Sequence, residues 1–175
     1  MHIRPATLDD ADALSALLAD YMREQGLGHP GSTADELRRD VLSGSSGQRV
    51  IVAERDGRPV GFVAWDRAYD MHWAARGIQI ADVYVEPGSR GHGVALAMLV
   101  AVCAGGRAEG AVFVRGDSYD RSSATGRFYE RIAVGMDAAE CTCGGRAFRR
   151  LAELHGQPVR TIIRNLPPRE WNFEA

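Results

Sequence analysis

A chain of 175 residues, 45% of them hydrophobic and 25% charged, has the length and composition of one globular domain with a sizeable core. Its 21 basic and 23 acidic side chains leave a formal net charge of -2, so no global positive field attracts nucleic acid or an anionic membrane. No stretch approaches the ~20 apolar residues that span a bilayer, and the N-terminus lacks the apolar run of a signal peptide. We therefore expect a cytoplasmic protein whose partners are small molecules or proteins.

Two helices are predicted in the N-terminal quarter, after a short apolar start over residues 3–6. The first covers residues 8–24, with Thr7 as its N-cap. Its apolar face recurs every three or four residues, at Leu14, Leu17, Leu18 and Tyr21. The glycines and the proline within residues 26–31 end this helix, and Ser32 or Thr33 caps a second one that ends before residue 43.

Apolar, β-branched runs predict the strands that follow. Residues 50–54 and 60–65 form two of them, joined through Asp56-Gly57, a dipeptide common in hairpin turns. After a loop over residues 67–76 we expect a strand over 78–85, then a helix over 94–108 and a strand over 111–114. The order strand, glycine loop, helix, strand indicates an α/β fold.

The segment from Trp65 to Trp73 is rich in aromatic and acidic residues. Aromatic faces and carboxylates together suit a slot for a cationic amine. The same composition suits a dimer surface, and we expect a homodimer. The sequence does not separate the substrate slot from the interface.

The loop Arg90-Gly91-His92-Gly93-Val94-Ala95 precedes the predicted helix over 94–108. The first amides of a helix lack backbone partners and the helix dipole is positive there, so main chain alone can bind an anion. Gly91 and Gly93 allow phosphates to approach the backbone, and Arg90 can add a positive charge. A plain strand-to-helix turn is the simpler interpretation, and a dinucleotide-binding loop lacks its third glycine because position 96 is Leu.

Arg90, Gly93 and Ala95 match the pyrophosphate motif of the GNAT family of acetyl-CoA-dependent N-acetyltransferases, and residues 82–87 resemble the fourth strand of that family. The resemblance implies a GNAT fold, a mixed central sheet flanked by helices, and acetyl-CoA as cosubstrate without a metal. The residues that it places at the cofactor are Val83, Tyr84, Val85, Arg90, Gly91, His92, Gly93, Val94, Ala95 and Ser122.

The resemblance also implies catalytic residues. The segment 122–130 is similar to a family element that carries an Asn and then a Phe-Tyr pair, with Ser122 at the Asn position. Tyr129 would be the general acid that protonates the departing thiolate. A substrate ammonium must also lose a proton before it attacks. Asp82 is the first candidate for this base or for a substrate anchor, followed by Glu86 and His72.

The C-terminal part departs from the family. We predict a strand near 138–143 and helices over 145–154 and 158–166, so that one domain over residues 1–175 has a GNAT core, 1–144, and an atypical helical extension, 145–175. Cys103, Cys141 and Cys143 are odd in number and lack typical zinc spacing, so we expect reduced thiols.

The leading interpretation is an enzyme that transfers acetyl from acetyl-CoA to a primary amine, on a small molecule or a protein, by direct attack in a ternary complex. A non-catalytic acyl-CoA sensor of the same fold is the alternative, because it needs the glycine loop but neither Tyr129 nor Asp82. An unrelated α/β interaction protein is the third interpretation, marked by failure to bind CoA.

Overall fold

The computed structural model describes residues 1–116, 153–154 and 158–165, and the chain divides into two compact units, Met1–Tyr119 and Asp120–Ala175. In the second unit the described residues include helix α6, Val159–Arg164, where the sequence predicts a helix over 158–166. The predicted strand near 138–143 and nearly all of the predicted helix over 145–154 lie outside the described residues. No helix in the described parts is long and apolar enough to cross a membrane.

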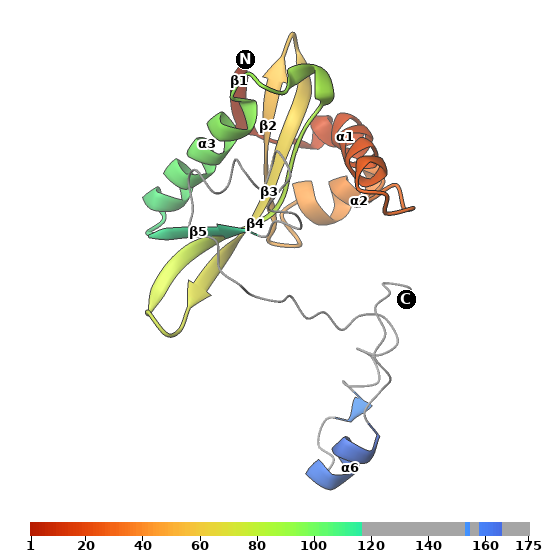
Figure 1. Ribbon diagram of the computed structural model, residues 1–175, viewed down its shortest axis with the longest axis vertical. Helices are drawn as coiled ribbons and strands as arrows, with labels where there is room; N and C mark the ends of the chain where they lie inside the picture. The colour runs from red at the N-terminus through yellow and green to blue at the C-terminus, as the bar shows by residue number, and fades with distance from the viewer. Residues whose placement is uncertain (117–152, 155–157, 166–175) are drawn as a thin grey trace. The chain divides into compact units, whose positions relative to one another are not determined.

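The first unit is built on a mixed five-stranded sheet in the order β1-β2-β3-β4-β5 (Figure 1). The four antiparallel strands are β1 (His2–Pro5), β2 (Arg49–Arg55), β3 (Arg58–Asp70) and β4 (Ala75–Val85), and β5 (Phe113–Gly116) is parallel to β4. Asp56 and Gly57 have φ of 52° and 78°, the left-handed turn that the Asp-Gly dipeptide predicts. β5 begins two residues later than the sequence indicates.

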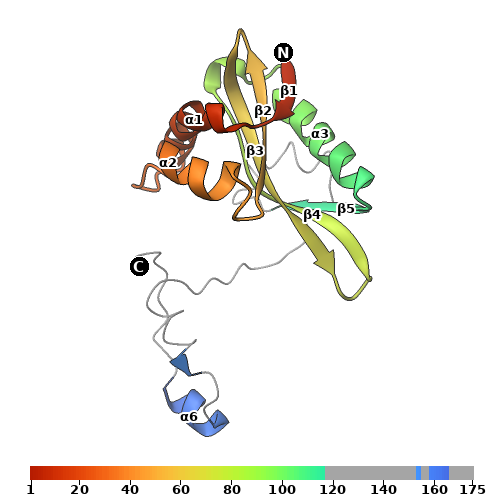
Figure 2. The same ribbon diagram turned by 180° about the vertical axis from the view of Figure 1, so that it is seen from behind.

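Helices cover both faces of this sheet. α1 (Ala11–Glu24) follows a short 3-10 turn, α2 (Ala34–Glu36) continues into a π-helical segment (Leu37–Leu42), and α3 (Val94–Ala108) connects β4 to β5. α1 and α2 lie on one face and α3 on the other, as the two opposite views show (Figures 1 and 2). Thr33 is the N-cap of α2, since its hydroxyl accepts a hydrogen bond from the Glu36 amide.

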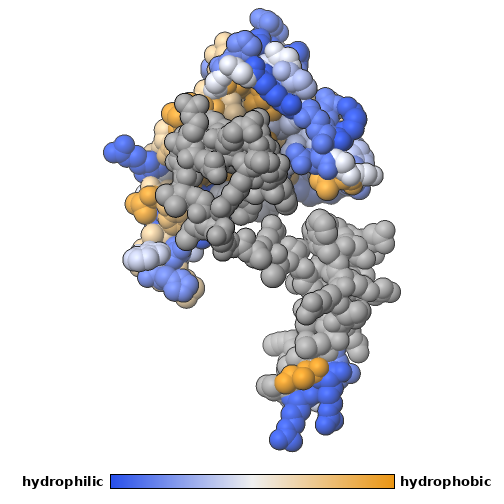
Figure 3. Space-filling model, in the orientation of Figure 1, coloured by the Kyte–Doolittle hydropathy of each residue, from blue (hydrophilic) through white to orange (hydrophobic). Residues whose placement is uncertain are grey.

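Each face holds its own apolar layer. On the α1 face, buried residues of the helices pack on the sheet, and they are Ala11, Leu14, Leu17, Leu37, Val52, Phe62 and Tyr84. The buried residues of α3 are Val94, Met98, Leu99, Val102 and Gly106. The outward surface of α1 and α2 is largely hydrophilic (Figure 3), as expected for helices with one buried face.

The predicted loop over residues 67–76 is wrong. β3 continues to Asp70 and β4 begins at Ala75, so only four residues form the turn of a long hairpin. β2 pairs with β3 no further than Trp65, and β3 beyond that point carries exposed and half-buried side chains. A strand that is not buried on one face carries no apolar alternation, which is why the sequence pattern does not show it.

The first part of the aromatic segment is therefore a strand and not a loop, and its Trp65, Arg67 and Tyr69 line a pocket of about 380 Å³; the predicted use of such a slot for a cationic amine stays a prediction. Trp65 is buried in the sheet, whereas Tyr69, Met71 and Trp73 are strongly exposed. The hairpin places these side chains along its arm and at its tip, where Met71 and Trp73 are 85% and 82% exposed.

Candidate active site

β4 has one edge without a partner strand among the described residues from Ala81 onward. β5 pairs with Gly77–Ile80, and no described strand continues this pairing. Against β3 the register shifts between Ala64 and Trp65, which leaves Ala81 as an extra residue in β4. A bulge of this kind bends its strand and redirects the edge beyond it.

The backbone polar groups on this edge can be assigned from the hydrogen bonds to β3. The Glu86 amide donates to the Val60 carbonyl at 3.0 Å. Alternate residues of an antiparallel strand turn both polar groups to the same neighbour, so Tyr84 also faces β3. The N–H and C=O groups of Val83 and Val85 therefore face the open edge. Tyr84 contributes its side chain, which packs on α1, rather than an edge amide.

The glycine loop leads directly from this edge to the N-terminus of α3. Gly91 and Gly93 have φ of +78° and +75°, and a Cβ built at either position meets no atom of the described residues within 4 Å. Both glycines are therefore required by backbone conformation, and the space above them is open. The first helical bond runs from the Ala97 amide to the Gly93 carbonyl, and no side chain caps the helix. The preceding amides, including those of Val94 and Ala95, thus lack an intrahelical acceptor.

Arg90, the first residue of the loop, turns its side chain back toward β4 and α1. Its Nε donates to the Val85 carbonyl at 2.7 Å, and its Nη2 lies 2.9 and 2.7 Å from the two carboxylate oxygens of Glu24. The guanidinium also lies over the ring of Tyr84, 5.4 Å from its centroid. Arg90 is thus already paired with a carboxylate, and the predicted phosphate contact of its side chain stays a prediction.

His92 and Ser89 contact the loop itself. The His92 Nδ1 lies 2.7 Å from the Arg90 carbonyl oxygen, which can only accept, so Nδ1 carries the proton of this bond. Ser89 is buried and donates through its hydroxyl to the Glu86 carboxylate at 3.0 Å. These contacts anchor both ends of the turn that presents the two glycines.

Asp82 lies on the α1 face of β4, two residues before Tyr84, and is half-buried. Burial raises the pKa of the Asp82 carboxyl, and a hydrogen bond donated by the Tyr21 hydroxyl opposes part of this rise. Tyr21 in turn packs against Tyr84 with 5.7 Å between ring centroids. A carboxylate whose pKa is raised toward the working pH accepts a proton more effectively than an ordinary surface carboxylate.

The two other candidate bases are placed less favourably. Glu86 accepts two hydrogen bonds from Arg58, at 2.8 and 2.9 Å, and these bonds lower the pKa of its carboxyl. His72 lies at the tip of the β3–β4 hairpin with its side chain 94% exposed. Asp82 is seven residues into β4, so by strand rise it lies roughly 20 Å from that tip. Ser122 and Tyr129 lie outside the described residues.

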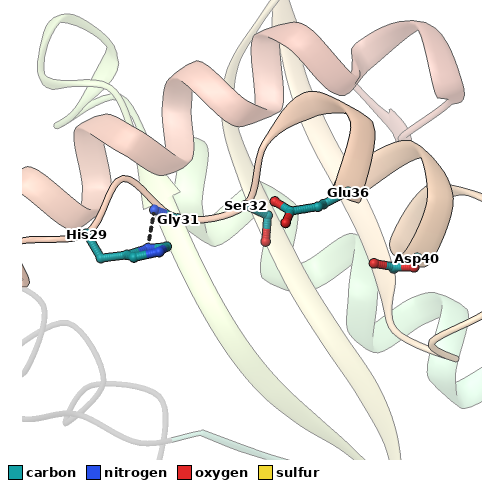
Figure 4. Close-up of a pocket in the computed structure, with 5 residues that line it drawn as sticks. All are labelled: His29, Gly31, Ser32, Glu36 and Asp40. Carbon is teal, nitrogen blue, oxygen red and sulfur yellow. Dashed lines mark hydrogen bonds between the residues drawn. The ribbon is translucent and has the colours of Figure 1, made fainter. Parts of the chain in front are cut away.

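A pocket of about 320 Å³ lies along the connection between α1 and α2 (Figure 4). Its lining is His29, Gly31, Ser32, Glu36 and Asp40. The Glu36 carboxylate accepts from the amide and hydroxyl of Thr33, and that of Asp40 accepts from the neighbouring Arg39. Both carboxylates already have partners, so this pocket does not by itself define an acceptor site.

A family model described as an acetyltransferase (GNAT) domain matches residues 46–132, which include the open edge of β4, the glycine loop and α3. The chain belongs to the GNAT superfamily. No curated protein sequence matches it.

Solved structures with the GNAT fold are similar over most of the chain. A ribosomal-protein-alanine N-acetyltransferase from Brucella melitensis biovar Abortus 2308 has a TM-score of 0.66 at 24% identity, over 82% of this chain and 99% of that one. An acetyltransferase from Trypanosoma brucei has a TM-score of 0.64 at 22% identity, over 81% and 97%. An aminoglycoside acetyltransferase from an uncultured soil sample has 0.64 at 19%, over 81% and 96%. At these identities the likeness shows the shared fold.

Two residues of the candidate site were not singled out by their sequence pattern. Tyr21 is predicted only as part of the apolar face of α1. Glu24 is predicted only as the last residue of that helix. They are three residues apart on one helix, so they project from the same face. That spacing is the signal that could have found them, but only the fold shows that the shared face meets Asp82 and Arg90.

Proposed function

We propose that this GNAT protein transfers an acetyl group from acetyl-CoA to a primary amine, by direct attack of the amine within a ternary complex. The observation that carries the proposal is that the β4 edge from Ala81 onward has no partner strand among the described residues and leads through the glycine loop to the N-terminus of α3, which no described side chain caps.

The main chain from this edge to α3 fits a CoA thioester. The amides before Ala97 suit the pyrophosphate, because uncapped amides and the positive helix end bind anions without a side chain. The open space at Gly91 and Gly93 admits the phosphates to the backbone. The N–H and C=O groups of Val83 and the N–H of Val85 on the β4 edge suit the amide groups of the pantetheine arm, since an edge strand pairs with an extended chain; the Val85 carbonyl accepts from Arg90. Acetyl-CoA supplies the activated acetyl group.

Asp82 is the proposed proton acceptor. An amine with a pKa near ~10 is nearly all ammonium at neutral pH and must lose a proton before its nitrogen can attack. The half-buried Asp82 carboxylate, oriented by Tyr21, takes this proton directly or through a water. The β4 edge amides stabilise the oxyanion that forms on attack. Tyr129 is the proposed acid for the departing thiolate, on the GNAT resemblance of its segment.

A non-catalytic acyl-CoA sensor is the second candidate. It shares the loop and the strand edge and does not require a proton acceptor. The raised pKa of Asp82 favours the enzyme. Partial burial disfavours the ionised carboxylate and so costs stability, and a sensor has no use for such a group.

The test measures release of free thiol from acetyl-CoA with a panel of small amines and peptides, together with calorimetric binding of CoA. The variants are Asp82→Asn, Tyr129→Phe and Gly93→Val, with Gly88→Ala as the matched control. Gly88 is close to the loop, has no positive φ and has open space around its Cβ position, so this variant should behave as wild type.

If the protein is an enzyme, we expect turnover with at least one amine. Gly93→Val should abolish CoA binding, whereas Asp82→Asn should retain binding and lose on the order of a hundredfold or more in kcat/KM. CoA binding without turnover on any amine supports the sensor instead. No CoA binding by the wild type overturns both.

A further inference from the structure

The guanidinium of Arg90 belongs to a partly exposed cluster with Glu24 and Tyr84. Glu24 is the last residue of α1, and its carboxylate receives two contacts from Arg90 Nη2 and one from the Tyr84 hydroxyl, the last at 2.9 Å. Arg90 also lies over the Tyr84 ring. Three elements thus meet here: the end of α1, strand β4 and the start of the pyrophosphate loop.

The pKa shifts of Glu24 and Tyr84 both favour the protonation states that this cluster needs, an ionised carboxylate and a neutral phenol. Burial opposes the ionisation of Glu24, but the hydrogen bonds from Arg90 and Tyr84 prevail and lower the pKa of its carboxyl. Burial and the bond to Glu24 raise the pKa of Tyr84 to about 12, so its hydroxyl remains a donor. The Arg90 side chain is therefore held by a charged acceptor, a carbonyl and an aromatic face at once.

This geometry differs from that of a phosphate ligand. A phosphate that recruited Arg90 would have to compete with the Glu24 carboxylate, and the Nε bond to Val85 directs the fork toward the strand instead of the open space over the glycines. The ion pair of Arg90 with Glu24 has no net charge and so adds little attraction for an anion, but the anchored guanidinium fixes the main chain that precedes Gly91.

We propose that Glu24 is a positioning residue for cofactor binding: with Tyr84 it holds Arg90 as a brace between α1, β4 and the loop, so that the loop amides take the pyrophosphate. This inference rests on the proposed use of acetyl-CoA. In this proposal Arg90 fixes the position of the loop and does not bind a phosphate. Glu24 belongs to the site although it lies outside the motif of residues 90–95.

A double-mutant cycle on CoA affinity tests the brace. Glu24→Gln and Arg90→Met should each weaken CoA binding about tenfold in calorimetry, and the double variant should be no weaker than either single one, because each removes the same brace. Arg90→Lys should not restore affinity, since it keeps the charge but lacks the fork and the Nε donor. Glu24→Asp should restore part of it.

Two further measurements distinguish positioning from general damage. The slope of CoA affinity against salt should be the same in Arg90→Met as in wild type, because a brace removes no phosphate contact. The KM for acetyl-CoA should rise while kcat at saturating acetyl-CoA stays within about twofold. Asp20→Asn is the control, since it removes one charge from the exposed Asp20–Arg23 pair of the same helix and should change nothing.

The contrary outcomes are specific. If Arg90 is a phosphate ligand, Glu24→Gln releases it and leaves CoA affinity unchanged or higher, Arg90→Met flattens the salt slope, and Arg90→Lys binds well. Any of these overturns the brace while the proposed function stands. If the wild type binds no CoA, the proposed function fails and the brace proposal fails with it.

Discussion

Tyr21 of α1 donates a hydrogen bond to the Asp82 carboxylate on β4. The pair joins the helical layer to the strand that leads into the glycine loop, and it holds a half-buried carboxylate beside the bulge at Ala81. Burial disfavours the charged carboxylate, so the position that suits a proton acceptor also weakens the fold at neutral pH.

Asp82→Asn should therefore stabilise the protein near pH 7. The pKa of Asp82 is higher in the folded than in the unfolded state, so between the two values the folded chain binds more protons, and the free energy of unfolding falls as pH rises through that window. The gain from the Asn variant should be complete at neutral pH and vanish below the unfolded pKa. Urea unfolding at several pH values measures it. Asp35→Asn, at a 92% exposed side chain, is the control and should show little pH-dependent gain.

Asp10→Asn, in contrast to Asp82→Asn, should lower the free energy of unfolding near pH 7. The Asp10 carboxylate is buried, accepts from both Nη atoms of Arg4 at 2.7 and 2.8 Å, and also receives the Thr7 amide at 2.7 Å. The hydrogen bonds from Arg4 are the main cause that lowers the pKa of Asp10 to about 2. This stability is present above the unfolded pKa and is lost as pH falls through the folded pKa.

The Asn variant should lose roughly 2 kcal/mol of unfolding free energy at pH 7, and the difference should shrink as pH falls from about 4 to 2. Glu54→Gln removes the other partner of Arg4, which is partly exposed, and should cost less than about 1 kcal/mol. Equal losses for Asp10→Asn at pH 7 and pH 2 would contradict the assignment.

Gly105 and Gly106 of α3 should respond oppositely to alanine. A Cβ at Gly106 would lie 2.2 Å from Cδ1 of buried Ile78, whereas one at Gly105 meets nothing within 4 Å. Gly105→Ala should stabilise by up to about 1 kcal/mol through helix propensity. Gly106→Ala should destabilise, because overpacking costs about 1–3 kcal/mol.

Ile78→Val removes Cδ1, the nearer of the two Ile78 atoms that the added Cβ would meet, while the contact with Cγ1 at 2.8 Å remains, so it should rescue Gly106→Ala in part. Thermal or urea unfolding of the four variants would show a favourable coupling of about 1 kcal/mol between the two positions. Additive effects would mean that α3 shifts instead of clashing, and would refute the close packing of α3 on β4.

Glu86→Gln should leave acetyl transfer nearly intact. Its carboxylate is bonded by Arg58 and by Ser89, and its pKa is lowered by the Arg58 bonds, so it is a poor proton acceptor. We expect kcat/KM within about threefold of wild type, against a loss on the order of 10² to 10⁴ for Asp82→Asn. The pH profile of kcat/KM decides which of the two carboxylates is the base. Loss of the acidic limb in the Glu86 variant would show that the base is Glu86 and not Asp82.

The local pattern of the sequence was sufficient for the elements that bury one face. α1, α3 and the buried parts of β2, β3 and β4 lie where periodicity predicts them, because burial imposes period 3.6 on helices and apolar runs or alternation on strands. Gly91 and Gly93 could be identified for the same kind of reason, since a positive φ is a requirement of the chain itself.

Tertiary structure decided what depends on neighbours distant in sequence. Residues 67–70 of β3 and the first two residues of β4 are exposed or half-buried, so they show no apolar pattern and were predicted as part of a loop. Arg90 was expected at a phosphate, but Glu24, 66 residues away, pairs with its side chain. The pKa of Asp82 depends on burial and on Tyr21, and only the packing of α1 on the sheet brings these together. The backbone preference of a segment depends on its own consecutive residues. The pairing of side chains and the desolvation of buried groups depend on the packing of the helices against the sheet.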